Sequence, residues 1–140
     1  MYYHFKIRKE KTGFSAQGVE LKQCITQAET MEELHANMEE VLDLFLSEPI
    51  DSTVKFPRPK KEVAGKDIVP VRVDPQIAFA IMLRQERLRQ GLTQRKAADL
   101  LDIKNLSQYQ KLEKPEGNPG LVTLARIKKT FPNIIVDEAL

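Results

Sequence analysis

Hydrogen-bonding side chains recur at helical spacing within residues 93–113, and they are of the types that proteins use to bind nucleic acids. The second half of this stretch predicts a short helix with a polar outward face. Serine, glutamine and lysine side chains can read the edges of base pairs in the major groove of DNA. We therefore predict that this helix reads bases through Ser107, Gln108, Gln110 and Lys111.

Further hydroxyl, amide and cationic side chains surround these positions and can donate hydrogen bonds to phosphate oxygens. The alternative is an ordinary helical hairpin whose polar residues face water, which is the commoner outcome for two arbitrary amphipathic helices. The predicted phosphate-binding residues are Thr93, Gln94, Arg95, Lys96, Lys104, Asn105 and Lys114.

Two helix starts and one short turn must position these side chains. Gly91 ends the preceding helix, and the Thr93 hydroxyl can cap the next one. After a turn at residues 102–104, Asn105 can cap the second helix, while small Ala98 lets the two helices cross closely. The expected inward residues are Ala97, Leu100, Leu101, Leu106, Tyr109 and Leu112.

Longer helices are predicted on both sides of this pair. Asp74 and Pro75 form a strong helix start, as cap and first helical residue. Arginines at positions 84, 87 and 89 suit the C-terminal turns of that helix. A closing helix is expected over residues 121–131, after a loop at residues 115–120.

This order of four helices resembles the Cro/C1-type repressors, in which the second helix of the pair docks in the major groove. Gln94, Ala98 and Glu113 stand at positions that match the pattern of that family. Asp102 stands where the family usually has glycine, and the turn is one residue longer. The resemblance implies that residues 69–140 form an all-α helix-turn-helix domain that binds DNA.

The chain has 140 residues, of which 41% are hydrophobic. This length allows one ordinary domain or two small ones. Two domains of about seventy residues would be marginal alone, so we expect a homodimer or a higher homo-oligomer. The single Cys24 excludes an intramolecular disulfide and fits a reducing compartment. No bilayer-spanning apolar run and no signal peptide are visible, which predicts a cytoplasmic protein without membrane contact.

Charge is unevenly distributed along the chain. Residues 1–53 contain five Lys/Arg against ten Asp/Glu, residues 54–68 five against two, and residues 69–140 twelve against eight. A basic C-terminal part agrees with nucleic-acid binding, and an acidic N-terminal part would attract a basic protein. A solvated helix face is the alternative reading of the acidic residues.

The N-terminal part predicts a small sheet followed by one helix, so that the whole chain falls in the α+β class. A capping box at Thr30 opens the helix, which should end before Pro49. Gly13 supplies a turn between the first two strands. The three strands are expected at residues 2–8, 14–19 and 22–29.

A linker is predicted where prolines and basic residues replace helical periodicity, although Val54 and Phe56 could add an edge strand. We assign the basic run at residues 58–61 to solubility rather than to DNA contact. A further strand is expected at residues 68–73, and the β-prone run at residues 134–136 is either tucked into the core or used in dimerisation. The predicted division is 1–53, linker 54–68 and 69–140.

Taken together, the two halves resemble the HicB antitoxins of bacterial toxin–antitoxin pairs. The resemblance follows the order of parts over nearly the whole chain and is most specific in CITQAET followed by MEELHANMEEVLDLFL. Gly13 and Phe14 are kept, but residues 19–23 replace the family's usual proline- and glycine-containing loop. The resemblance implies a partly ribonuclease H-like N-terminal domain that neutralises a small basic HicA-type toxin, an RNA-cleaving protein.

The same resemblance implies that the helix-turn-helix represses the protein's own operon at operator DNA. The alternative is a free-standing Cro/C1-type repressor with a sensing or oligomerising N-terminal domain. A short basic protein encoded beside this one would favour the antitoxin. The expected toxin-binding residues are Glu32, Glu33, Glu39, Glu40 and Asp43.

Catalysis, cofactors and metal binding are not expected. A metal-dependent nuclease needs converging carboxylates on strands, whereas most acidic residues of the N-terminal part lie on one helix. His4 and His35 are better explained as surface residues than as general bases. Cys24 is expected to be a partly buried strand residue.

Overall fold

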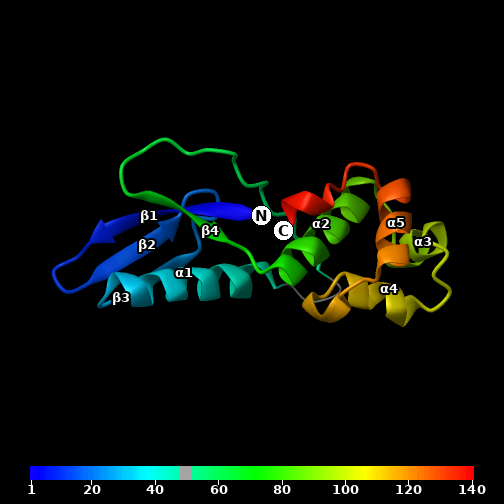
Figure 1. The fold of residues 1–140 in the computed structure, drawn as a ribbon, viewed down its shortest axis with the longest axis horizontal. Coiled ribbons are helices and arrows are strands. Elements are labelled where there is room, and N and C mark those ends of the chain that lie inside the picture. Colours follow the sequence, from blue (N-terminus) through cyan, green and yellow to red (C-terminus); the bar gives the residue numbers. More distant parts are fainter. Residues whose placement is uncertain (48–51) are drawn as a thin grey trace. The chain divides into compact units, whose positions relative to one another are not determined.

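The structure, a computed structural model, describes residues 1–47 and 52–140. It has the expected α+β class, with a four-stranded antiparallel sheet and five α-helices among the described residues (Figure 1). The chain forms two compact units. One comprises Met1–Leu46 and Phe56–Val73, and the other comprises Ser47–Lys55 and Asp74–Leu140.

The sheet of the first unit has the strand order β3-β2-β1-β4, and every neighbouring pair is antiparallel. Gly13, in the turn between the first two strands, has a φ of 79°. A Cβ atom there would also collide with the Ala28 carbonyl oxygen, so both conformation and space require glycine. The strands are β1 (Tyr2–Lys9), β2 (Phe14–Gly18), β3 (Ile25–Ala28) and β4 (Ile68–Arg72).

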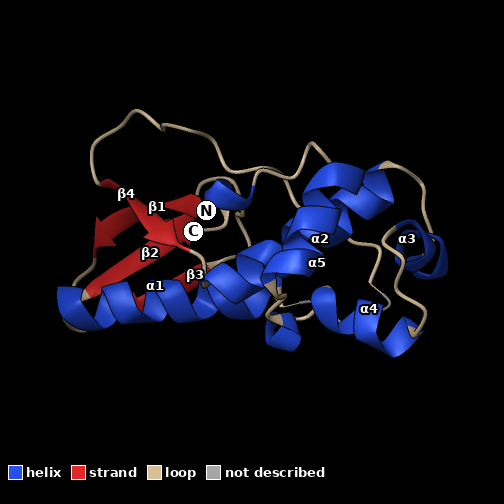
Figure 2. Cartoon of the chain, turned by 45° about the vertical axis from the view of Figure 1, so that its right-hand side comes forward, coloured by secondary structure: helices blue, strands red, loops and turns tan. Residues whose placement is uncertain are grey.

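Helix α1 (Met31–Leu46) lies along one face of this sheet (Figure 2). The Thr30 hydroxyl accepts a hydrogen bond from the Glu33 amide at 3.2 Å, which confirms the predicted cap. The side chains of Leu34, Met38, Leu42 and Leu46 are buried, as are those of Phe5 and Ala16 on the sheet. The helix ends at Leu46, and Pro49, the predicted stop signal, lies outside the described residues.

Strand β4 departs from the predicted division of the chain. The expected strand at residues 68–73 exists, but it pairs with β1, with Tyr3 opposite Val71. It therefore belongs to the N-terminal unit and not to the segment 69–140. Val71 of β4 and Val73, which follows the strand, are buried, which explains why this strand completes the sheet.

The connector, residues 56–67, is attached to the first unit at three places. The Phe45 and Phe56 ring centroids lie 5.6 Å apart, and the Tyr3 hydroxyl donates to the Pro57 carbonyl at 2.8 Å. The Lys60 amide donates to Glu20 Oε2 at 3.0 Å. The optional edge strand at Val54 and Phe56 is not formed. The predicted linker is thus a fixed segment over most of its length.

Four helices form the second unit, at the predicted places: α2 (Pro75–Arg89), α3 (Gln94–Leu100), α4 (Leu106–Leu112) and α5 (Leu121–Thr130). Asp74 Oδ1 accepts from the Gln76 amide at 2.9 Å, which confirms the cap of α2. After α5, Ile134 is buried and a short 3-10 turn follows at Val136–Glu138. The C-terminal run is therefore tucked in at Ile134, while Ile135 is exposed.

None of the helices in the described part of the chain combines the length and apolar character that crossing a bilayer requires.

Candidate nucleic-acid interface

Helices α3 and α4 begin at the predicted caps. Thr93 Oγ1 accepts from the Lys96 amide at 3.1 Å, and Asn105 Oδ1 accepts from the Ser107 amide at 2.8 Å. Between the helices, Asp102 has a φ of 56°, in the left-handed region that glycine usually occupies. Glycine adopts this backbone conformation most readily, and aspartate tolerates it.

The turn is also tied together by Arg95, one of the predicted phosphate-binding residues. Arg95 Nη2 donates to Asp99 Oδ1 at 2.8 Å, to the Lys104 carbonyl at 3.1 Å and to the Ile103 carbonyl at 3.3 Å. Its guanidinium therefore positions the turn between α3 and α4. The Arg95 side chain would have to leave these partners before it could bind a phosphate group.

The inner faces of the two helices pack as predicted with one exception. Ala97, Ala98 and Tyr109 are fully buried, and the small side chains of α3 allow the close crossing. Leu100, expected to point inward, is instead 56% exposed. The adjacent Leu101 at the C-cap takes the core position, because the helix ends at Leu100 and the chain turns there.

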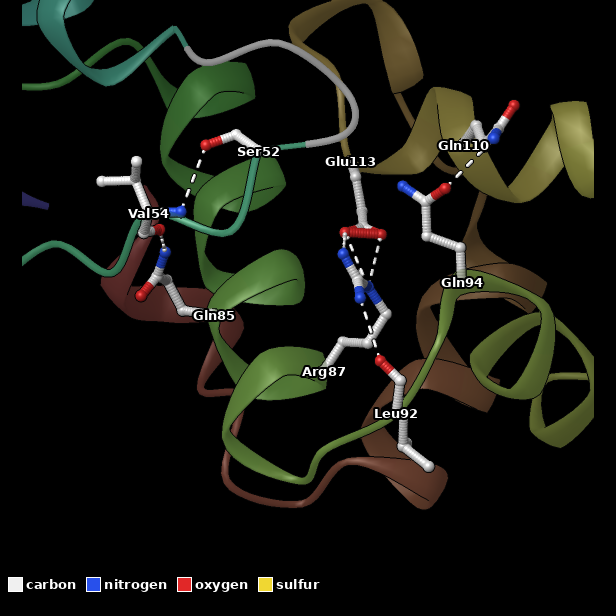
Figure 3. Close-up of polar contacts among 8 residues, drawn as sticks. All are labelled: Ser52, Val54, Gln85, Arg87, Leu92, Gln94, Gln110 and Glu113. Atoms are coloured by element: carbon white, nitrogen blue, oxygen red, sulfur yellow. Dashed lines mark hydrogen bonds and ion pairs between the residues drawn. The ribbon is translucent and has the colours of Figure 1, made fainter.

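A glutamine pair links the start of α3 to α4 (Figure 3). Gln110 Nε2 donates to Gln94 Oε1 at 3.1 Å, so the predicted base reader Gln110 is half-buried and engaged with α3. Gln94 begins the first helix of the pair. The contact holds both side-chain amides between α3 and α4.

A buried ion pair joins α2 to the end of α4 (Figure 3). Arg87 Nη2 lies 2.9 Å from Glu113 Oε1, and Arg87 Nη1 donates to the Leu92 carbonyl at 2.9 Å. Arg87 and Glu113 are both buried. Arg87 lies in the last turn of α2, as predicted, and its buried ion pair also positions α4 against α2.

The outward face of α4 contains three exposed side chains with no intramolecular hydrogen bond within the described chain: Ser107, Gln108 and Lys111. Three lysines nearby in sequence, Lys96, Lys104 and Lys114, are also exposed. Donors and cations of this kind suit base edges and phosphate oxygens, respectively. The other face of the helix is fixed by Tyr109, Leu112 and Glu113.

The remaining predicted site residues lie on the other unit. The four glutamates at positions 32, 33, 39 and 40 of α1 are exposed, and Asp43 is half-buried. At 3.6 residues per turn, these five residues occupy an arc of about 120° on the helix. The arc faces away from the buried side chains of α1, so the acidic residues form one solvated surface.

Two expectations about nucleophiles and bases need correction. His4 is buried, not at the surface, and its Nδ1 lies 2.9 Å from Glu20 Oε2. Cys24 is fully buried and precedes β3, and burial raises the pKa of its thiol to about 11. Such a thiol is protonated at neutral pH and poorly reactive. Within residues 1–47 and 52–140, no three His, Cys, Asp or Glu side chains gather as metal ligands would.

No protein-family model matches this chain, and no curated protein matches it.

Sequence reasoning missed the two contacts that hold α4 in place. The Arg87–Glu113 pair spans 26 positions and the Gln94–Gln110 pair spans 16, so neither follows from helical periodicity. One signal was present in the sequence. Glu113 is the one acidic residue at the end of a helix whose remaining residues are neutral or basic. Such a residue suggests a cationic partner elsewhere in the chain.

Proposed function

We propose that this chain binds double-stranded DNA in a sequence-dependent manner through α4. The observation that carries the proposal is the contrast between the two faces of this helix. One face is fixed by buried contacts, and the other presents Ser107, Gln108 and Lys111 without partners in the described chain. A rigid helix with aligned, unoccupied donors meets the geometric demand of major-groove recognition.

Exposed residues around α4 would position it on the duplex. Lys96, Lys104 and Lys114 can each neutralise a phosphate group. Gln108 is the residue we assign to direct base reading, because its side chain is exposed within the first turn of α4. Glutamine can bind adenine through two hydrogen bonds.

Binding as a homodimer would place two copies of α4 on successive half-sites, about 34 Å apart. Two exposed apolar side chains at the start of α5, Leu121 at 85% and Val122 at 68% exposure, are suited to such an association. Analytical ultracentrifugation of the wild type and of a Leu121→Glu, Val122→Glu variant tests this assignment. A wild type that stays monomeric at micromolar concentration would contradict it.

The experiment that tests DNA binding uses duplexes from the region upstream of the gene and compares Gln108→Ala with Lys111→Ala. Gln108→Ala should cost about 1–3 kcal/mol on the preferred site and relax sequence preference. Lys111→Ala should weaken binding to all duplexes and reduce the salt slope by about 1. Unchanged affinity of both variants would exclude α4 as the recognition helix.

We further propose that the first unit neutralises a small basic toxin of the HicA type, as the resemblance to HicB antitoxins suggests. The specific support is the exposed acidic arc of α1, since opposite charge speeds and orients docking. Co-expression with the protein encoded beside this one, followed by capture and an RNA-cleavage assay, tests this. Stoichiometric capture with loss of cleavage supports the antitoxin.

Capture that fails, together with operator binding by this chain alone, would instead favour a free-standing repressor. The variant for the toxin test combines Glu32→Gln with Glu39→Gln. Both positions are exposed and lie on the side of α1 that faces away from its buried residues. Glu116→Gln, an exposed residue of the second unit, serves as the control. Slower association for the first variant alone would assign the contact to α1.

A further inference from the structure

The face of the sheet that α1 does not cover is basic, although the N-terminal segment as a whole is acidic. Side chains alternate between faces along a strand, so Tyr2, His4, Lys6 and Arg8 of β1 point to the same side. Buried Phe5 and Ile7 point to the other side, which α1 covers. The side chains of Lys6 and Arg8 are exposed and have no hydrogen-bond or ion-pair partner within the described chain.

The neighbouring strands extend this surface with cationic and hydrogen-bonding residues. Arg72 of β4 lies opposite Tyr2, and Gln17 and Ser15 of β2 lie opposite Lys6 and Arg8. Gln27 of β3 lies opposite Ser15 and is exposed. No strand position on this face is acidic in the described structure, so the strands alone give it a positive character.

The basic run of the connector is brought to the same face. The Lys60 amide donates to Glu20 Oε2, and the same carboxylate binds outward-facing His4 through its ring and its amide. Two exposed cations, Lys60 and its neighbour Lys61, are thus brought next to the surface.

Two loop carboxylates, Glu20 and Glu10, are hydrogen-bonded to residues of this face. Burial raises the pKa of Glu20, but hydrogen bonds from the His4 ring, the His4 amide and the Lys60 amide outweigh it and lower the pKa overall. Glu10 Oε1 accepts from the Ser15 hydroxyl at 2.7 Å at the hairpin end. Neither carboxylate makes an ion pair with Lys6 or Arg8.

We propose that this basic sheet face, formed by β1, β2, β3 and the connector, binds single-stranded nucleic acid. Cations along a flat surface can follow the phosphates of a single strand, while amide and hydroxyl side chains reach the exposed base edges. Tyr2, which is 49% exposed beside Arg72, offers a ring on which a base can stack. In a duplex the faces of the bases are covered by stacking, so only an unpaired strand offers a base to the Tyr2 ring.

The sheet surface is separate from α4, so this proposal stands independently of DNA recognition by the second unit. The proposal also assigns nucleic acid as the binding partner of the basic residues of the connector. The other occupant that charge alone would allow is the acidic α1 of a second copy. The hydrogen-bonding and aromatic side chains of the face favour nucleic acid, because an ion-pairing surface has no need of them.

The test measures fluorescence anisotropy of labelled oligouridylate and oligothymidylate of about twelve nucleotides with the full chain at about 50 mM salt. Lys6→Gln with Arg8→Gln should weaken binding on the order of tenfold and lower the salt slope by about 1.4. The matched control neutralises two exposed lysines of α5, Lys128→Gln with Lys129→Gln, and should bind like the wild type.

Tyr2→Leu should lose affinity while Tyr2→Phe keeps it, which separates stacking from general charge. Gln108→Ala with Lys111→Ala should leave oligonucleotide binding unchanged even if duplex binding is lost. Thermal unfolding confirms that each variant is folded. Binding of both probes indicates single strands in general, and binding of oligouridylate alone indicates RNA.

Three outcomes would overturn the proposal. The first is that neither oligonucleotide binds, and the second is that the α5 control pair weakens binding as much as the Lys6 and Arg8 pair. The third is self-association of the wild type, without nucleic acid, that the Lys6 and Arg8 pair abolishes. That last result would assign the face to a second copy of this chain.

Discussion

Arg87 and Glu113 form a buried ion pair in which Arg87 Nε lies 3.0 Å from each carboxylate oxygen of Glu113. Because the pair joins α2 to the C-cap of α4, it sets the orientation of the helix that we assign to DNA recognition. Loss of one partner would leave the other charge buried, which is more costly than losing the attraction alone.

We expect Glu113→Ala or Arg87→Ala to lower the free energy of unfolding by about 3–5 kcal/mol, measured by urea denaturation. Arg87→Met combined with Glu113→Leu should recover part of this loss, since neither charge then remains buried. The control is Asp99→Ala, which removes the exposed ion pair with Arg95 and should cost at most about 1 kcal/mol. Single variants as stable as this control would contradict the assignment.

The Tyr109 hydroxyl is buried beside the same ion pair without a hydrogen-bond partner in the described structure. Burial, followed by the negative charge of Glu113, raises the pKa of this phenol. Tyr109→Phe removes an unpaired polar atom and keeps the ring, so it should stabilise the protein by about 1 kcal/mol. Tyr109→Ala should cost about 3–5 kcal/mol by leaving a cavity.

Thermal unfolding of these two variants checks the prediction. A clear loss of stability in Tyr109→Phe would mean that the hydroxyl is paired in solution.

The Asp102 backbone is left-handed, and aspartate accepts this conformation at a cost that glycine does not pay. Asp102→Gly should therefore change stability by less than about 1 kcal/mol, in the stabilising direction, while Asp102→Val should destabilise by about 1–2 kcal/mol. Circular dichroism melting curves compare the three proteins. Equal melting temperatures for the valine and glycine variants would show that the turn is not left-handed.

The Glu86 carboxyl should make stability depend on pH in the acid range. Hydrogen bonds from Arg89, and further ones from Gln90 and Asn133, lower the pKa of Glu86 to about 2. Burial acts in the opposite direction but does not outweigh them. The unfolded chain binds this proton at higher pH than the folded chain does. The contribution of Glu86 is therefore complete above about pH 5 and is lost as the pH falls toward 2.

Urea denaturation at several pH values tests this with Glu86→Gln. The stability difference between wild type and Glu86→Gln should be largest near neutral pH and should shrink on acidification. Glu116→Gln, an exposed glutamate in the same unit, is the comparison. A Glu86→Gln difference that stays constant from pH 7 to about pH 2 would contradict the assignment.

Strand β4 determines which fragment of the first unit can fold alone. A fragment of residues 1–53 lacks β4, which leaves the central strand β1 as an unpaired edge and removes buried Val71 and Val73. We expect residues 1–73 to unfold cooperatively, and residues 1–53 to lack a cooperative transition or to aggregate. Equal thermal transitions for the two fragments would contradict the role of β4, and toxin capture should be tested with the longer one.

Local signals in the sequence predicted most of the elements but not their long-range pairing. The capping residues Thr30, Asp74, Thr93 and Asn105 mark helix starts correctly, because capping depends on neighbours two or three positions away. β4 was predicted as a strand but given to the wrong unit. Alternation of apolar residues identifies a strand, whereas its partner β1 lies far away in sequence.

The candidate site shows the same limit. Exposure of Ser107, Gln108 and Lys111 follows from helical periodicity, and the structure places them together on one face. The engagement of Gln110 with Gln94, and of Arg95 with the turn, depends on how two helices cross. The apolar periodicity of a single helix does not show how it crosses another helix.

The polypeptide passes between the two units three times, after residues 46, 55 and 73, because the segment Ser47–Lys55 belongs to the second unit and Phe56–Val73 to the first. Within the described part of that segment, Gln85 of α2 donates to the Val54 carbonyl at 2.8 Å (Figure 3). A single recombination event in the gene therefore cannot exchange one intact unit for that of another protein. Replacing one unit alone would need more than one crossover within the coding sequence.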